Sequence, residues 1–142
     1  MITINIASEF SEFPGLRHYN ISDHSGEVFY HSILNPKFAQ AYQNNEKIQI
    51  DIDSTAGYAS SFLDEAFGNL VYDFTLEVVL EKIIIISEQE PHWKEMILNQ
   101  TMPEWEKRRK NNKQPKVTKE HQPWYRLVNK KLILDVWEKC TV

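Results

Sequence analysis

One segment near the middle of the chain passes directly from the period of a β-strand to the period of an α-helix. Ile48, Ile50 and Ile52 alternate with polar residues, which predicts a half-buried strand over 48–53. After a loop with Gly57, apolar side chains recur in two adjacent helical rows, formed by Phe62, Ala66 and Leu70 and by Leu63, Phe67 and Val71. So wide an apolar face is typical of a helix on a sheet, and the segment predicts a strand–loop–helix unit.

The start of this predicted helix carries two hydroxyl side chains. Ser61, with Asp64 three residues later, has the pattern of an N-cap pair. Ser60 and Ser61 also lie where the free amides of a helix start favour an anion or a phosphate on the serine itself. A simple N-cap, which is common at helix starts, explains the same residues and is the interpretation that the chemistry alone favours. We expect the opposite face of the helix, with Asp64, Glu65, Gly68 and Asn69, to face solvent.

The rest of the chain predicts further alternation of strands and helices. Strands are expected over 2–6 and 83–86, the latter buried on both faces of the sheet, and a short strand over 17–21. Helices are expected over 76–82 and 90–99, and two short helices within 25–42, separated at Asn35-Pro36 because proline disfavours helix at the preceding residue. This order indicates an α/β or α+β fold with one mixed sheet.

Composition places the chain among soluble globular proteins of one domain. The chain has 142 residues, of which 42% are hydrophobic and 25% charged. Its single cysteine, Cys140, excludes an intramolecular disulfide, and the N-terminus lacks the apolar stretch of a signal peptide. No run approaches the roughly 18 apolar residues of a membrane span. We therefore expect a cytoplasmic protein with no membrane association.

Charge divides the chain at Pro103. Residues 1–102 hold 5 Lys or Arg and 15 Asp or Glu, a net charge of −10, whereas residues 103–142 hold 11 and 5, a net charge of +6. We predict a domain over 1–102, a basic polar linker over 103–122 and an apolar extension over 123–142. Trp124 and Trp137 make the extension too apolar to remain in water, so it docks on the domain or on a partner.

Patterns typical of catalytic sites are weak. The five histidines show no metal-ligand spacing, and the four glycines form no phosphate-cradling motif. The acidic residues Asp51, Asp53, Asp64 and Glu65 could be imagined as paired catalytic carboxylates, but a strand end and a helix face explain them better. We expect no enzyme activity, no metal and no cofactor.

Three stretches resemble a bacterial and archaeal family of STAS-like domains of unknown function: Ser25-Gly26-Glu27, the strand ending in Asp51-Ile52-Asp53, and the segment from Thr55 to Gly68. Arg17 lies where that family tends to have an arginine, and the resemblance covers about residues 1–100. It implies a single mixed sheet of about four to five strands, with helices packed mainly on one face.

The family is similar to the STAS domains of anti-sigma factor antagonists, in which a partner kinase phosphorylates a serine at the start of the equivalent helix. The resemblance implies that this serine is Ser60, with Ser61 beside it. Ala59 and Phe62 depart from the aspartate and glycine that flank the serine in those domains. The implied partner surface consists of Tyr58, Ser60, Ser61, Asp64 and Glu65.

Three functions follow as hypotheses. The first is a regulatory module, monomeric or homodimeric, that binds a protein partner such as an ATPase-type kinase or an anti-sigma-like factor. The second is a small-ligand sensor whose helix start holds a nucleotide or another anion, with Arg17 as the counter-charge. The third is a stress or phage-defence component whose basic tail contacts nucleic acid. Lysine runs without a recognised fold are weak evidence for such a contact, so we do not expect a nucleic-acid partner.

Overall fold

The computed structural model describes residues 1–137. The first half of the chain forms β1 (Ile2–Asn5), α1 (Ile6–Glu9), α2 (Gly26–Phe29), the π-helical turn η1 (Tyr30–Leu34), α3 (Asn35–Gln43) and β2 (Ile48–Asp51). The second half forms α4 (Ser60–Phe74), α5 (Leu76–Lys82), β3 (Ile83–Ile86), α6 (Pro91–Met96), the π-helical turn η2 (Ile97–Thr101), α7 (Met102–Lys110) and the strands β4 (Trp124–Val128) and β5 (Lys131–Asp135).

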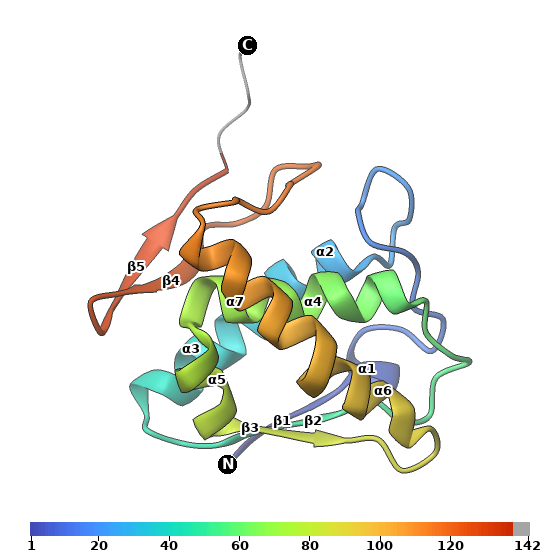
Figure 1. The fold of residues 1–142 in the computed structure, drawn as a ribbon. Helices are drawn as coiled ribbons and strands as arrows, with labels where there is room; N and C mark the ends of the chain where they lie inside the picture. Colours follow the sequence, from blue (N-terminus) through green and yellow to red (C-terminus); the bar gives the residue numbers. More distant parts are fainter. Residues whose placement is uncertain (138–142) are drawn as a thin grey trace.

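The strands form two separate sheets. A parallel sheet has the order β1-β2-β3, and β4 pairs with β5 as an antiparallel hairpin. In Figure 1 the parallel sheet lies at the bottom of the molecule, with the long helices above it. The α/β class and the strands over 2–6, 48–53 and 83–86 are confirmed, but the five strands do not share one mixed sheet, and residues 17–21 form no strand.

The isoleucine run of β3 lies at an edge of the parallel sheet. Only Ile85 of its four residues is buried, and it pairs with the buried Ile50 of β2. The prediction that this strand is buried on both faces is therefore wrong. Helices cover one face of the sheet, and β2 occupies the central position.

Two prolines lie inside helices that continue past them. Pro36 and Pro103 each follow a π-helical turn, η1 and η2, so the helices run without a break over 26–43 and 91–110. Inside a helix, proline lacks the N–H of the backbone hydrogen bond, and its ring crowds the carbonyl one turn earlier. A π-helical turn changes the hydrogen-bond pattern of that turn, so the helix can continue past the proline. The predicted break at Asn35-Pro36 and the predicted helix end near residue 99 are wrong for this reason.

Helix α4 passes through the centre of the molecule. Twelve of its 15 residues are buried, and it contacts α2, α7 and β4 as well as η1 and η2. Glu65, Gly68 and Asn69 are among the buried residues, so the expected solvent-facing stripe is wrong for these three. A helix surrounded on all sides must instead satisfy its polar groups internally.

The C-terminal part of the chain packs on this central helix. Residues 103–110, expected as linker, belong to α7, and the indole of Trp105 is buried against Gly68 of α4. Residues 111–123, which hydrogen-bond to Asn20 and Glu27 through Thr118, then lead to the hairpin, which lies against α3 and α4. Cys140 and the final residues of the predicted extension lie outside the described residues.

Candidate functional site

Helix α4 begins at Ser60 without a side-chain cap. The residue before it, Ala59, is extended, with φ −74° and ψ 137°. Ser60 is exposed and Ser61 is half-buried. Ser61 therefore lies inside the first turn and caps nothing, and the N-cap prediction is wrong.

Arg17 reaches this helix from the long loop between α1 and α2. Its Nη1 atom lies 2.6 Å from Oδ2 of Asp64 and 3.2 Å from Oε1 of Glu65. The backbone holds the loop in place as well, because the amide of Glu27 donates to the Arg17 carbonyl at 3.0 Å. The guanidinium is thus already matched by carboxylates.

A groove of about 570 Å³ opens beside the start of α4. It is lined by Ser60, Asp64 and Arg17 and, from α7, by Glu104 and Lys107. Of the sequence-predicted residues, the structure brings Arg17, Ser60 and Asp64 together here. Glu65 lies behind them, 3% exposed.

Tyr58 belongs to a different region. Its hydroxyl donates to the carbonyl of Ile52 at 2.7 Å, and its ring lies edge-on to Trp93 of α6. It lines a small cavity of about 120 Å³ beyond the ends of β2 and β3. Tyr58 therefore does not line the groove that Ser60 and Asp64 share.

A buried row of polar side chains follows α4 at intervals of one turn. Glu65, Asn69 and Asp73 are 3%, 4% and 2% exposed. The Asn69 amide uses both its N–H groups on Glu65, donating to its backbone carbonyl and to Oε2, each at 2.7 Å. Burial raises the pKa of Glu65 to about 7 despite the donors Asn69 and Arg17. The spacing of four residues indicates in the sequence that these side chains share one face of the helix, but not that this face is buried.

Asp73 ends the row and ties it to the C-terminal hairpin. It accepts a hydrogen bond from the Tyr30 hydroxyl and one from Nε of Arg126 at 2.9 Å. Arg126 in turn lies 3.1 Å from Oδ2 of Asp135 on the paired strand. Burial raises the pKa of Asp73 to about 6, against the opposing effect of Arg126.

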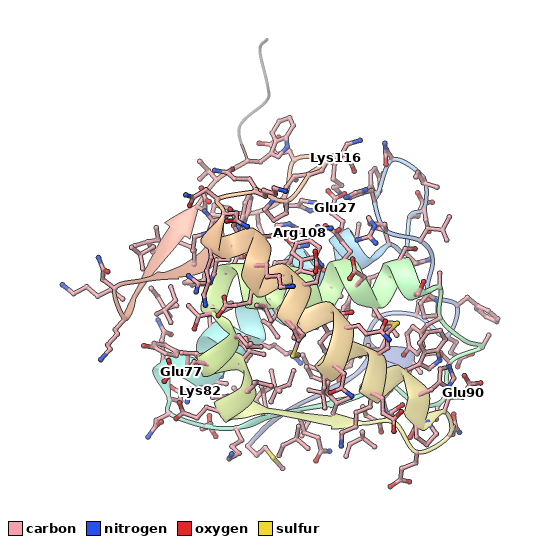
Figure 2. All side chains as sticks on the ribbon, viewed as in Figure 1. Glu27, Glu77, Lys82, Glu90, Arg108 and Lys116 are labelled. Carbon is pink, nitrogen blue, oxygen red and sulfur yellow. The ribbon has the colours of Figure 1, made fainter. Side chains whose placement is uncertain are left out.

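Glu27 on α2 ties down the segment that precedes the hairpin. Its carboxylate accepts from the amide of Thr118 at 2.9 Å, the hydroxyl of Thr118 at 2.6 Å and the amide of Tyr19 at 3.1 Å, and it lies 2.6 Å from Nε2 of His121. Burial alone would raise its pKa, but these hydrogen bonds outweigh burial and lower it to about 2. Figure 2 shows Glu27 below the segment that carries Lys116.

A cavity of about 520 Å³ lies between the Asp73 end of α4 and the C-terminal segments. Its walls include His31, Asn69 and Asp73 on one side and Gln114, Trp124, Arg126 and Trp137 on the other. The sequence does not reveal this cavity, because the residues on its two sides are 40 or more positions apart in the chain.

Within residues 1–137, no group of three or more His, Cys, Asp or Glu side chains is arranged to hold a metal ion. In the same part of the chain, none of the helices is both long and apolar enough to cross a membrane.

Comparison with known proteins identifies the central part of the chain. No curated protein and no solved structure matched it. A family model described as a STAS-like domain of unknown function matches residues 25–93, which include α2, β2 and the whole buried polar row, together with Tyr30, which donates to Asp73. The resemblance carried by Ser25-Gly26-Glu27 and Thr55 to Gly68 is confirmed. Residues 25–93 belong to the family of STAS-like domains of unknown function.

Proposed function

We propose that this chain is a non-enzymatic regulatory module that binds a protein partner through the groove beside the start of α4 and is switched by phosphorylation of Ser60. One observation carries the proposal: Ser60 is an exposed hydroxyl on the first turn of the central helix, in a groove that also holds Arg17 and Lys107. Membership of residues 25–93 in a STAS-like family supports the same region.

The ion pairs of Arg17 give the switch a physical basis. A phosphate on Ser60 adds a charge of about −1.5 to −2 beside the positive end of the α4 dipole. Asp64 lies one turn further along the helix, so the phosphate repels Asp64 and competes with it for Arg17. Arg17 lies in the loop before α2. If Arg17 binds the phosphate instead of Asp64, this loop shifts and the surface around the groove changes.

The same ion pairs weigh against a free nucleotide or other anion at the helix start. Arg17 faces Asp64 at 2.6 Å and Glu65 at 3.2 Å, so an incoming anion meets carboxylates that already hold the guanidinium. A covalently attached phosphate competes far better, because its local concentration is fixed by the bond. A kinase partner of the ATPase type therefore suits the groove better than a soluble anion.

Binding to candidate partners tests the proposal. The proteins encoded next to this chain's gene, any ATPase-type kinase first, are assayed for binding to the wild type, Ser60→Asp and Asp64→Arg. Ser8→Asp is the matched control, because Ser8 is an exposed serine in the first turn of α1 and does not line the groove. We expect both groove variants to change the affinity for the partner about tenfold or more, while Ser8→Asp leaves it unchanged. Equal binding by all four proteins counts against this surface.

A further inference from the structure

The cavity at the Asp73 end of α4 is lined by two parts of the chain that only the fold brings together. His31, Asn69 and Asp73 belong to the family-matched residues, whereas Gln114, Trp124, Arg126 and Trp137 belong to the C-terminal part. Its volume of about 520 Å³ lies within the 300–1,000 Å³ typical of small-molecule sites. The groove at the start of α4 is lined by entirely different residues.

The charges at this cavity are paired with one another. Arg126 donates to Asp73 at 2.9 Å and lies 3.1 Å from Asp135, so one guanidinium serves two carboxylates. An anion would have to displace Asp73 or Asp135 from Arg126, and the described residues hold no cluster of metal ligands. The cavity therefore suits an uncharged ligand better than an anion or a metal ion.

Its uncharged polar groups offer both donors and acceptors. The Asn69 amide spends both N–H groups on Glu65, which leaves its carbonyl oxygen as an acceptor. Gln114 supplies an amide with both functions. His31 is 2% exposed, and its Nδ1 has no hydrogen-bond partner within residues 1–137. Burial lowers the pKa of His31 to about 3, so its ring is neutral and carries one donor and one acceptor.

Two tryptophan rings also line the cavity, beside the aliphatic Pro115, Val117 and Val136. Trp124 lies edge-on to His31, with ring centroids 4.6 Å apart, and Trp137 lines the same cavity from beyond β5. Indole faces stack on flat heterocycles, while amide groups hydrogen-bond to the edges of such rings. We propose that this cavity binds an uncharged, flat nitrogen heterocycle of the nucleobase class, for which nucleosides are the probes.

Titration of the full chain with adenosine, guanosine, cytidine and uridine tests the inference, read by calorimetry and by the thermal unfolding midpoint. We expect saturable binding of at least one nucleoside. Trp137→Ala removes one stacking face and should weaken that binding about tenfold or more. Trp93→Ala is the matched control, because Trp93 is half-buried on α6 and lines a different cavity. The Trp93→Ala variant should bind the nucleoside with the affinity of the wild type.

Gln114→Ala provides a second variant in the segment without regular structure, should Trp137→Ala fail to fold, and it should also weaken binding. Inorganic phosphate and spermidine, added in the same assay, represent anionic and cationic ligands. Failure of all four nucleosides to bind at millimolar concentration overturns the inference, whether or not phosphate or spermidine binds. Nucleoside binding that is unchanged in both Trp137→Ala and Gln114→Ala also overturns it, because the ligand would then bind elsewhere.

Discussion

Glu27 shows how much structure one buried carboxylate can hold together. It is 1% exposed, and the four groups that hydrogen-bond to it belong to Tyr19 in the loop before α2 and to Thr118 and His121 in the segment before the hairpin. A carboxylate accepts all of these bonds, whereas an amide accepts only through its oxygen. The glutamate of the Ser25-Gly26-Glu27 stretch thus fastens the C-terminal part of the chain to the family-matched part.

Glu27→Gln should lower the free energy of unfolding by about 2 kcal/mol at pH 7, since hydrogen bonds to a charged group are lost. The folded pKa of about 2 lies below the ordinary 4.5, so the stabilisation by Glu27 is present above about pH 4.5 and is lost as pH falls toward 2. The difference between variant and wild type should therefore shrink between pH 7 and pH 3, measured by urea unfolding. Glu88→Gln, at an exposed position, is the control. A difference that is the same at both pH values contradicts the assignment.

Glu65 has the opposite pH dependence. Its folded pKa of about 7 lies above the ordinary 4.5, so the folded state holds more protons between these values and stability falls as pH rises through that window. Glu65→Gln does not titrate, so relative to the wild type it should gain about 1–3 kcal/mol between pH 5 and pH 8. Urea unfolding across this range measures the gain. Parallel profiles for the two proteins would show that burial does not control Glu65.

At the scale of elements, two glycines allow the neighbouring helices α7 and α2 to pack closely against α4. A Cβ on Gly68 would lie 2.1 Å from the Trp105 ring of α7, and one on Gly26 would lie 2.4 Å from the carbonyl oxygen of Phe62. Ser25 caps α2 by accepting from the amide of Val28 at 3.1 Å. The Ser25-Gly26-Glu27 stretch therefore combines a helix cap, a close helix contact and the Glu27 anchor.

Gly68→Ala should destabilise the protein by about 2 kcal/mol, because Trp105 is 1% exposed and has no room to move. Helix propensity alone predicts the reverse, a gain of about 1 kcal/mol. Urea unfolding decides between them. In a Trp105→Leu background the same substitution should cost clearly less, as expected for residues in direct contact. A stabilising Gly68→Ala would contradict the packing of α7 on α4.

The periodicity of the sequence predicted most elements but not their surroundings. Alternating isoleucines identified β1 and β2, and the two apolar rows identified α4. The rows could not reveal that the remaining face of α4 is also covered, because Glu65, Asn69 and Asp73 look like solvent-facing residues until their partners are known. Those partners include His18, Tyr30 and Arg126, which lie more than 40 positions away in the sequence. Charge composition likewise suggested a linker where α7 places Trp105 in the core.

At the scale of the whole molecule, Asn35 joins the hairpin to the helical body. Its Oδ1 accepts from the amide of Tyr125 at 2.8 Å, and its Nδ2 donates to the carbonyl of Tyr125 at 2.9 Å. The side chain thus pairs with β4 much as a neighbouring strand would. Asn35 lies directly before Pro36, in the helix that the sequence predicted to break there.

Asn35→Ala should loosen the hairpin without opening the parallel sheet, because the two sheets share no strand. Hydrogen exchange of residues 124–128 should accelerate about tenfold or more, while exchange in β1, β2 and β3 stays unchanged. Gln43→Ala, at an exposed position near the end of the same helix, is the control. Uniform acceleration throughout the chain would show instead that the substitution lowers global stability.

The phosphorylation state of Ser60 tests the proposed function most directly. Trypsin releases the start of α4 in one peptide, residues 48–82, because the nearest lysines are Lys47 and Lys82. The chain is isolated from its own cells during growth and under stress, and tandem mass spectrometry locates phosphate within this peptide. We predict phosphate on Ser60 in at least one condition, absent from that peptide in Ser60→Ala. A peptide that is unmodified in every condition, or phosphorylated only at another residue, would contradict the Ser60 switch.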